Sequence, residues 1–372
     1  MKSVMVIGVG HVGSWALEML ARTPGVERII AADINESYAS RRAKAAQCGA
    51  SHLGFYPEIE FQRLDVANVE QTAGILKQVN PTVILSTLTL ISPYAAADLP
   101  KKKAELVEDA GIGSFLPCHL LLQYRLMQAA DGAGIDPLIV DSSFPDAIIP
   151  ILHRAKCRAP VLGLGNLDNL VPIIRMQVAG KMNTNMRDVR VYLVSYHVNN
   201  VWCSRQRPNG MPPYWMKIVV NDRDVTDQFD TQELMLNTSK HKNRLGGTDG
   251  SSLTASSAVK HTLALLHESD LFTHSPGAKG LVGGYPVQIS ARKVEIALPD
   301  DITLEEAIKI NEEGQYRDGI EEIKDDGTVI FTDEAVSLMK EAIGYECKSM
   351  TLDEVEGRAK ELLSKFREAA GK

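Results

Sequence analysis

Three glycines near the start of the chain have the spacing G-x-G-x-x-G. Gly8, Gly10 and Gly13 follow a short apolar run and precede apolar residues that recur at helical intervals. In a strand–turn–helix unit, the first glycine permits the turn, the second lets the backbone approach a pyrophosphate, and the third lets helix and strand pack closely. The helix would direct unpaired N–H groups at that pyrophosphate. The residues predicted to bind a dinucleotide in this turn are Gly8, Gly10, His11, Val12 and Gly13.

Acidic and polar residues end the strands that follow this turn. The second predicted strand closes on Asp33, where a ribose 2′-hydroxyl needs an acceptor. Its carboxylate would repel a 2′-phosphate, which favours NAD, but Arg41 and Arg42 could accept that phosphate, so NADP stays possible. Ligands of open α/β sheets bind beyond the carboxyl ends of the strands. The ends of the strands at 60–66 and 82–86 therefore supply further cofactor-binding candidates, which are Asp65, Val66, Ser86 and Thr87.

The second half of the chain offers three candidate catalytic residues. Dehydrogenation with a nicotinamide cofactor needs a group that binds the substrate, a base near the reacting bond and exclusion of water. His197 ends a predicted strand and could be the base, although a lone histidine is often structural. Lys217 would become reactive if burial lowered its pKa, or it simply faces solvent. Tyr285 lies in a glycine-rich loop, where it could touch substrate or cap the core.

Four residues are candidates for binding the substrate. Arg205 and Arg207 could hold a carboxylate in bidentate fashion. Ser143 and Asp146 follow a predicted strand at 137–141, in a polar loop that could line the cleft or merely connect two elements. A turn-rich stretch at 240–250 could form a lid.

Composition narrows the class of protein. The 372 residues carry a net charge of −7, so there is no basic surface that suggests nucleic acid or an anionic membrane as a partner. Five scattered cysteines predict reduced thiols, and neither they nor the histidines have metal-binding spacing. Cys118 reads as a small buried hydrophobe in preference to a nucleophile. The chain opens directly on a strand and no apolar run approaches the ~20 residues of a membrane span, so we expect a cytoplasmic protein.

The order of predicted elements indicates two domains. Over 1–122, strands and helices alternate, which predicts a Rossmann-type, doubly wound parallel sheet. Over 123–335, strands follow one another without long helices between most of them, which predicts an α+β domain with a mainly antiparallel sheet. A helix at 252–267 interrupts that sheet, and a C-terminal helix at about 336–372 is expected to pack back on the first domain. An exposed sheet makes a homodimer plausible.

These motifs together resemble the saccharopine dehydrogenase-like family. The resemblance rests on the glycine turn, Asp33, the strand ends at 64–66 and 86–87, and the element at 143–146, and is best over the first 150 residues. It implies an NAD(P)-dependent oxidoreductase that acts on amino acids or opine-type secondary amines, and hence a small-molecule substrate with an amine and a carboxylate. It also implies that the α+β domain at 123–335 serves substrate binding and oligomerisation.

Two other functions stay open at this point. A Rossmann dehydrogenase of a hydroxy acid or semialdehyde would need the same cofactor motif, because fold alone does not fix the reaction. A regulator that binds the dinucleotide without turnover would need the motif but no catalytic base.

Overall fold

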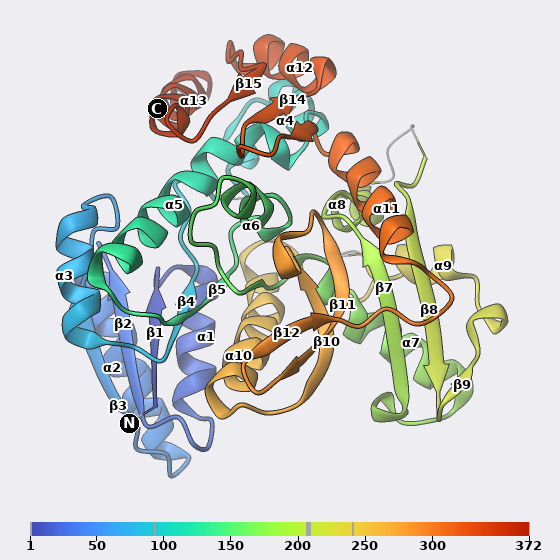
Figure 1. The fold of residues 1–372 in the computed structure, drawn as a ribbon, viewed down its shortest axis with the longest axis horizontal. Coiled ribbons are helices and arrows are strands. Elements are labelled where there is room, and N and C mark those ends of the chain that lie inside the picture. The colour runs from blue at the N-terminus through green and yellow to red at the C-terminus, as the bar shows by residue number, and fades with distance from the viewer. Residues whose placement is uncertain (1, 93, 206–209, 240–241, 372) are drawn as a thin grey trace.

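A six-stranded parallel sheet forms the first half of the protein. The computed structural model describes residues 2–92, 94–205, 210–239 and 242–371. The strand order is β3-β2-β1-β4-β5-β6 (Figure 1). The strands are β1 (Ser3–Ile7), β2 (Arg28–Asp33), β3 (Glu58–Arg63), β4 (Val83–Ser86), β5 (Leu138–Asp141) and β6 (Leu162–Gly163). The order reverses between β1 and β4, which is the switch point where such sheets bind ligands. The predicted Rossmann-type sheet is confirmed.

Helices cover both faces of this sheet, so it is doubly wound. Alternate residues of β1 enter separate cores: Val4 and Val6 pack with α1 (His11–Ala21), α2 (Glu36–His52) and α10 (Ser251–His267). Met5 and Ile7 pack with α3 (Val69–Val79), α5 (Leu116–Ala133) and α6 (Pro145–Arg154). Burial on both faces explains why β1 is apolar throughout and does not alternate.

An antiparallel sheet forms on the other side of the molecule. Its order is β10-β11-β7-β8-β9, with β12 paired to β11 (Figure 1). The strands are β7 (Val189–Ser195), β8 (Tyr214–Val220), β9 (Arg223–Asp224), β10 (Leu271–Pro276), β11 (Gly284–Ser290) and β12 (Lys293–Ile296). In β7, Val191 and Leu193 are buried while Arg190 is exposed, as a half-buried strand requires. The predicted antiparallel sheet is confirmed.

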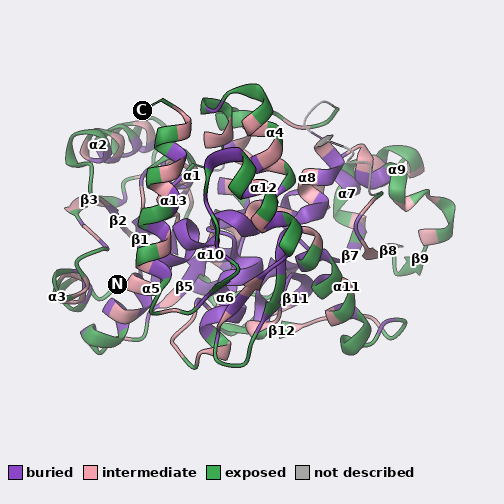
Figure 2. Ribbon diagram, turned by 90° about the horizontal axis from the view of Figure 1, so that it is seen from above, coloured by how far each residue is buried: buried purple, intermediate pink, exposed green. Residues whose placement is uncertain are grey.

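Three helices pack on β7 and β8. These are α7 (Val171–Met182), α8 (Val198–Arg205) and α9 (Thr231–Leu236), and they share a core with Leu193, Trp202 and Ile218. The helix predicted at 252–267 has a different place. As α10 it lies beside α1 against the parallel sheet, in the middle of the densely buried region that Figure 2 shows.

A third sheet lies in the C-terminal part and was not predicted from the sequence. Its antiparallel strands are β13 (Ile320–Ile323), β14 (Val329–Phe331) and β15 (Ser349–Met350). Strands of two to four residues are too short to show a period of two. The nearby helices are α4 (Lys101–Asp109), α11 (Leu304–Arg317), α12 (Asp333–Ile343) and α13 (Val355–Ala369). A capping box of Thr303 and Glu306 starts α11.

The last helix packs on the first part of the chain. The rings of Phe115 and Phe366 meet edge to face at 6.0 Å. Arg125 Nη2, on α5, lies 2.6 Å from Glu356 Oε2, on α13. Because the parallel sheet also includes β5 and β6, it extends past residue 122, the domain boundary predicted from the sequence.

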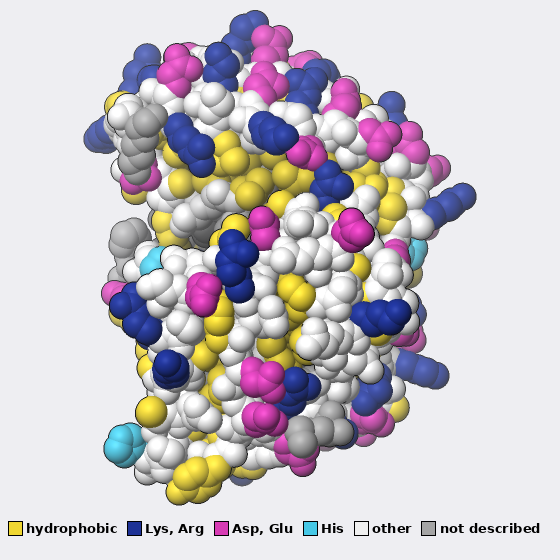
Figure 3. All heavy atoms as spheres, turned by 90° about the vertical axis from the view of Figure 1, so that its left-hand side faces the viewer, with side chains coloured by type: hydrophobic (Ala, Val, Ile, Leu, Met, Phe, Trp, Pro, Cys, Tyr) yellow, Lys and Arg dark blue, Asp and Glu magenta, His cyan; other side chains and the backbone are white. Residues whose placement is uncertain are grey.

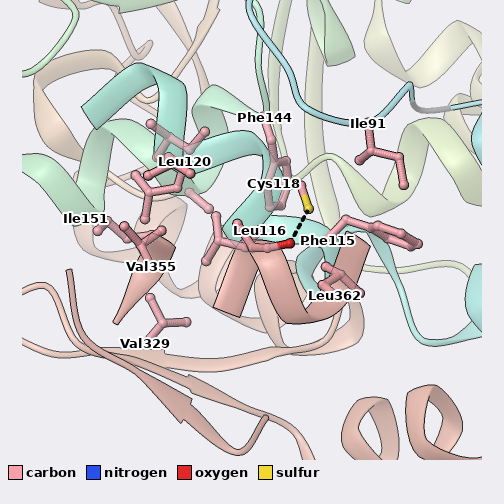
Figure 4. Close-up of a cluster of buried hydrophobic side chains, with 14 of the residues drawn as sticks. Ile91, Phe115, Leu116, Cys118, Leu120, Phe144, Ile151, Val329, Val355 and Leu362 are labelled. Carbon is pink, nitrogen blue, oxygen red and sulfur yellow. Dashed lines mark hydrogen bonds between the residues drawn. The ribbon is translucent and has the colours of Figure 1, made fainter. Parts of the chain in front are cut away.

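Cys118 lies in this buried interface and is not reactive. Its thiol points to the carbonyl oxygen of Ala359 among apolar side chains (Figure 4). Burial raises the pKa of the Cys118 thiol to about 12, so it stays neutral at physiological pH. Among the residues described, no helix is both long and apolar enough to cross a membrane.

Candidate active site

The glycine turn has the geometry that its three residues predict. Gly8 has φ +91°, a conformation that favours glycine. A Cβ on Gly13 would collide with the carbonyl oxygen of Gly8, so only glycine allows α1 to approach β1 this closely. A Cβ on Gly10 would have no neighbour within 4 Å. The backbone at Gly10 therefore faces open space, as a turn that admits a pyrophosphate must.

The carboxylate of Asp33 lies directly against this turn. Its Oδ2 accepts a hydrogen bond of 2.7 Å from the backbone N–H of Val9, and its Oδ1 accepts one of 2.8 Å from Asn35. Each oxygen keeps a second lone pair that can accept from a ribose hydroxyl. The turn and the acid thus form one unit that suits a dinucleotide.

The other predicted cofactor contacts divide into two groups. Thr87 closes the turn from β4, because its N–H donates to Ile7 at 2.9 Å and its hydroxyl donates to Gly8. Asp65 is at the strand end and holds the following turn through Ala67 N–H. The position of Ser86 contradicts the prediction that its side chain binds the cofactor. Ser86 is fully buried and its hydroxyl pairs with Gln123 of α5. Of the other predicted residues, His11 is exposed, Val12 is half-buried and Val66 is buried.

The surface on the side of α2 and α3 has a depression (Figure 3). In Figure 3, the side that carries α2 and α3 faces the viewer, and hydrophobic side chains gather along a hollow across its upper half. The parallel strands point their carboxyl ends toward that upper part in Figure 1. This is where ligands of such sheets bind.

A second group of polar side chains surrounds His197, just after β7. His197 Nδ1 lies 2.9 Å from Asp318 Oδ2, at the end of α11. Its ring meets the ring of Phe144 edge to face at 5.5 Å. Phe144 comes three residues after the end of β5, so it brings the histidine to the carboxyl edge of the parallel sheet. Asp146 follows at the start of α6, is fully buried, and accepts a hydrogen bond from the side-chain amide of Asn166.

Burial and charge set the protonation of this group. Burial alone would lower the pKa of His197, but the charge and hydrogen bond of Asp318 outweigh it, so the net shift is upward. Burial raises the pKa of Asp146 to about 6, although the nearby His197 opposes that rise. Two carboxylates beside one imidazole thus make a site that favours positive charge.

His119 faces the same region as a neutral hydrogen-bond acceptor. Burial and the nearby His197 lower its pKa to about 4. The hydroxyl of Thr89 donates to the carbonyl of Ile91, so the contact of 3.1 Å between Thr89 Oγ1 and His119 Nδ1 places the proton on Nδ1. Nε2 of His119 then carries a lone pair.

Several buried polar atoms near His197 have no hydrogen-bond partner. They are His119 Nε2, Asp146 Oδ1, Tyr196 Oη and Arg244 Nε. Buried polar groups are normally paired, and orphans cost free energy unless a ligand or water satisfies them. Their gathering around one histidine is what a substrate site requires.

Two of the predicted catalytic residues lie elsewhere, and the structure corrects both. Tyr285 is fully buried on β11, and its hydroxyl donates to the carbonyl of Val282 at 2.9 Å, so it belongs to the core. Lys217 lies 2.9 Å from Asp301 Oδ2 and 3.4 Å from Asp224 Oδ2. Its hydrogen bond to Asp301 raises the pKa of Lys217, which is the opposite of what a base needs.

The predicted substrate-binding residues have mixed outcomes. Asp146 lies in the group around His197, whereas Ser143 donates its hydroxyl to the carbonyl of Leu88 and ties the loop after β5 to the loop after β4. Arg207 and part of the predicted lid, residues 240–241, lie outside the described residues, as does the side chain of Arg205.

Sequence reasoning missed four residues of this group. They are His119, Asn166, Arg244 and Asp318. Asp318 Oδ2 meets a histidine 121 positions away, a separation that no local pattern can reveal. Arg244 lies in the turn-rich stretch that was noted only as a lid. In the part of the chain that the structure describes, no three His, Cys, Asp or Glu side chains gather in a way that could hold a metal ion.

Comparison with known proteins agrees with the geometry of the turn. Residues 4–109 match the family described as the saccharopine dehydrogenase NADP binding domain. No curated protein matches the chain. A malate dehydrogenase from Salinibacter ruber superimposes with a TM-score of 0.55 at 18% identity, over 85% of this chain and 95% of that one.

Two lactate dehydrogenases have a similar fold. The enzyme MGS-M5 from a Medee basin deep-sea metagenome library has a TM-score of 0.56 at 13% identity, over 85% of this chain and 96% of that one. The Cryptosporidium parvum enzyme, solved with lactic acid and nicotinamide adenine dinucleotide, has a TM-score of 0.54 at 15% identity, over 97% and 98%. At these identities the likeness shows the fold alone.

The fold and the turn define an oxidoreductase with an NAD(P)-binding Rossmann domain. Over residues 4–109, that domain is of the saccharopine dehydrogenase NADP-binding type, which confirms the resemblance expected from the sequence.

Proposed function

We propose that the protein is an NAD(P)-dependent oxidoreductase of an amino acid, imino acid or opine-like substrate. The observation that carries this proposal is the position of His197, paired with Asp318 and close to Asp146, at the edge of the sheet that also holds the dinucleotide turn. When bound, the nicotinamide would supply or take up the hydride at the carbon that bears the nitrogen. Gly8, Gly10, Gly13 and Asp33 would hold the dinucleotide.

His197 is the proposed acid–base group. The carboxylate of Asp318 holds Nδ1–H, which leaves Nε2 to exchange a proton with the substrate nitrogen. An ammonium must lose a proton before its carbon can lose hydride, and the neutral imidazole would take that proton. Asp318 then stabilises the imidazolium, as the raised pKa of His197 indicates.

The two buried carboxylates favour a nitrogen over an oxygen at the reacting carbon. Oxidation of an amine produces a cationic C=N group, whereas oxidation of an alcohol produces a neutral carbonyl. Asp146 Oδ1 has no hydrogen-bond donor in the described structure and could accept an N–H of such a cation. The two carboxylates would stabilise the oxidation of a hydroxy acid less, because its product is neutral.

A hydroxy-acid dehydrogenase is the second candidate. Its support is the shared fold with lactate and malate dehydrogenases over most of the chain, together with a His–Asp pair that could equally exchange a proton with a hydroxyl. A dinucleotide-binding regulator is the third, and the orphaned polar atoms around His197 argue against it, because a regulator needs no such site.

One assay separates the three candidates. The purified protein is incubated with NAD and then NADP across amino acids, opines, hydroxy acids and semialdehydes, and absorbance of the reduced nicotinamide is followed. The proposal expects turnover on amines. Turnover on hydroxy acids or semialdehydes only would establish the second candidate, and tight dinucleotide binding without any turnover would establish the third.

The finer predictions from the sequence belong to this proposal. They are a preference for NAD, a division into a cofactor domain and a substrate domain, a cytoplasmic location and a homodimer. Gel filtration with light scattering measures the last of these, and a mass of about 41 kDa would reject it.

A further inference from the structure

Arg244 is a guanidinium held entirely by neutral groups. Its Nη2 donates to Asn200 Oδ1 at 2.7 Å and lies 3.4 Å from Ser204 Oγ. Both partners are on α8, the helix that starts next to His197. Nε of Arg244 is buried and has no acceptor in the described structure.

Among the described residues, no Asp or Glu side chain forms an ion pair with Arg244, although the structure forms such pairs for other arginines. An arginine stays protonated in proteins. Arg244 is half-buried. A cation that is partly removed from water without a paired anion is unfavourable, and this cost is offset only when an anion binds in good geometry.

Hydrogen bonds place Arg244 beside the proposed reaction centre. The backbone N–H of Asn200 donates to the carbonyl of His197 at 2.9 Å, and the side chain of Asn200 accepts from Arg244. Asn200 thus bonds both to the backbone of His197 and to the guanidinium of Arg244. Its charge also acts on the imidazole and opposes the rise in the pKa of His197.

We propose that Arg244, oriented by Asn200 and Ser204, binds the carboxylate of the substrate next to the carbon that His197 serves. This assignment rests on the proposed function and narrows it, because the substrate must carry a carboxylate close to its amine. Guanidinium and carboxylate have matching planar geometries and form paired hydrogen bonds. The phosphates of the cofactor are assigned to the glycine turn of β1, so they do not account for this cation.

Binding and kinetics with three variants test the assignment. Arg244→Gln removes the charge, and Asn200→Asp keeps the arginine but supplies an internal counter-ion that competes with the ligand. Arg187→Gln is the matched control, because Arg187 is exposed and bonds only to Asn185. Amino acids and their carboxamides are titrated by calorimetry into the protein saturated with reduced NAD(P), and KM and kcat are measured for the same compounds.

We expect Arg244→Gln and Asn200→Asp to weaken amino acid binding by about 100-fold, which is about 2.8 kcal/mol, and to raise KM more than they lower kcat. Carboxamides should bind almost equally to wild type and both variants, and Arg187→Gln should match wild type. Circular dichroism and thermal melting show that each variant is folded. Equal amino acid affinity in wild type and Arg244→Gln would overturn the assignment.

Three further outcomes test this assignment and distinguish its failure from failure of the proposed function. If Arg244→Gln weakens the dinucleotide and leaves amino acid affinity unchanged, the guanidinium binds a phosphate and the assignment is wrong. If wild type oxidises amines that lack a carboxylate as well as those that carry one, the assignment fails while the proposed function stands. If amino acids bind through Arg244 without any turnover, the proposed function fails and the carboxylate site stands.

Discussion

The carboxylate of Asp33 both contacts the glycine turn and influences the choice between NAD and NADP. It accepts from Val9 in the glycine turn and has lone pairs left for a ribose. We predict that Asp33→Asn weakens NAD by about tenfold and NADP by less, because the amide removes the charge that repels a 2′-phosphate. Fluorescence titration with both reduced cofactors measures this, with the exposed Glu36→Gln as control. An equal loss for both cofactors would reject the role given to this acid.

The pair of His197 and Asp318 makes a prediction about pH. Asp318 raises the pKa of His197, so Asp318→Asn should lower it. In the direction of amine oxidation the base must be neutral, and the acidic limb of the kcat/KM profile should therefore move to lower pH by about one unit. Asp301→Asn, at the remote partner of Lys217, serves as control. If the acidic limb of the kcat/KM profile stays at the same pH in Asp318→Asn, another group is the base.

Residue types alone separate functional from structural side chains poorly in this protein. His197 and Tyr285 were predicted on equal grounds, as polar residues in a region with turns. Burial decides between them, since Tyr285 is satisfied inside the core whereas His197 is paired with a distant carboxylate. Neither burial nor a partner 121 positions away is visible in a local motif.

At the scale of elements, the β1–α1 unit allows the sharpest test. Gly13→Ala would drive a Cβ into the carbonyl of Gly8, so we predict a protein that is markedly destabilised. Gly10→Ala meets no neighbour within 4 Å and should fold and melt like wild type, yet bind the dinucleotide at least tenfold more weakly, because the methyl stands where the pyrophosphate approaches.

Thermal melting and cofactor titration of the two variants distinguish packing from binding. If Gly10→Ala binds NAD(P) as wild type does, the dinucleotide does not pass over this turn.

Elements with a strong local pattern were predictable, and short ones were not. The strands β1, β2, β4, β5, β7 and β8 have apolar runs or alternation that match their observed positions closely. The strand β3 lies at 58–63 and not at the predicted 60–66, and the two-residue strand β6 was not predicted. The helix α10 was recognised, but its place against α1 depends on long-range packing. The sheet of β13, β14 and β15 has too few residues in each strand to give any signal.

At the scale of the whole molecule, buried histidines predict acid sensitivity. Burial lowers the pKa of His119, His261 and His274 to about 4. Between pH 4 and their ordinary value of 6.5 the unfolded chain binds more protons than the folded one, so stability should fall as pH falls through this window. Burial raises the pKa of Asp141 and Asp146, and these two carboxyls act in the opposite sense and offset part of the effect of the three histidines.

The variant His274→Leu tests whether histidines buried in the neutral form cause this acid sensitivity. Both ring nitrogens of His274 lack partners in the described structure, so an apolar side chain of similar volume should be tolerated. We predict that the slope of unfolding free energy against pH decreases by up to about 1.4 kcal/mol per pH unit in this window. Urea denaturation at a series of pH values measures the slope. An unchanged slope would show that His274 is not held neutral.

The transfer of hydride from the carbon that bears nitrogen is the central claim, and isotope labelling tests it most directly. An amino acid that supports turnover is prepared with deuterium on that carbon, and the reduced nicotinamide is examined by mass spectrometry. We predict one deuterium in the reduced cofactor and slower turnover than with the unlabelled compound. Deuterium released to water, or reduction without label, would contradict the account.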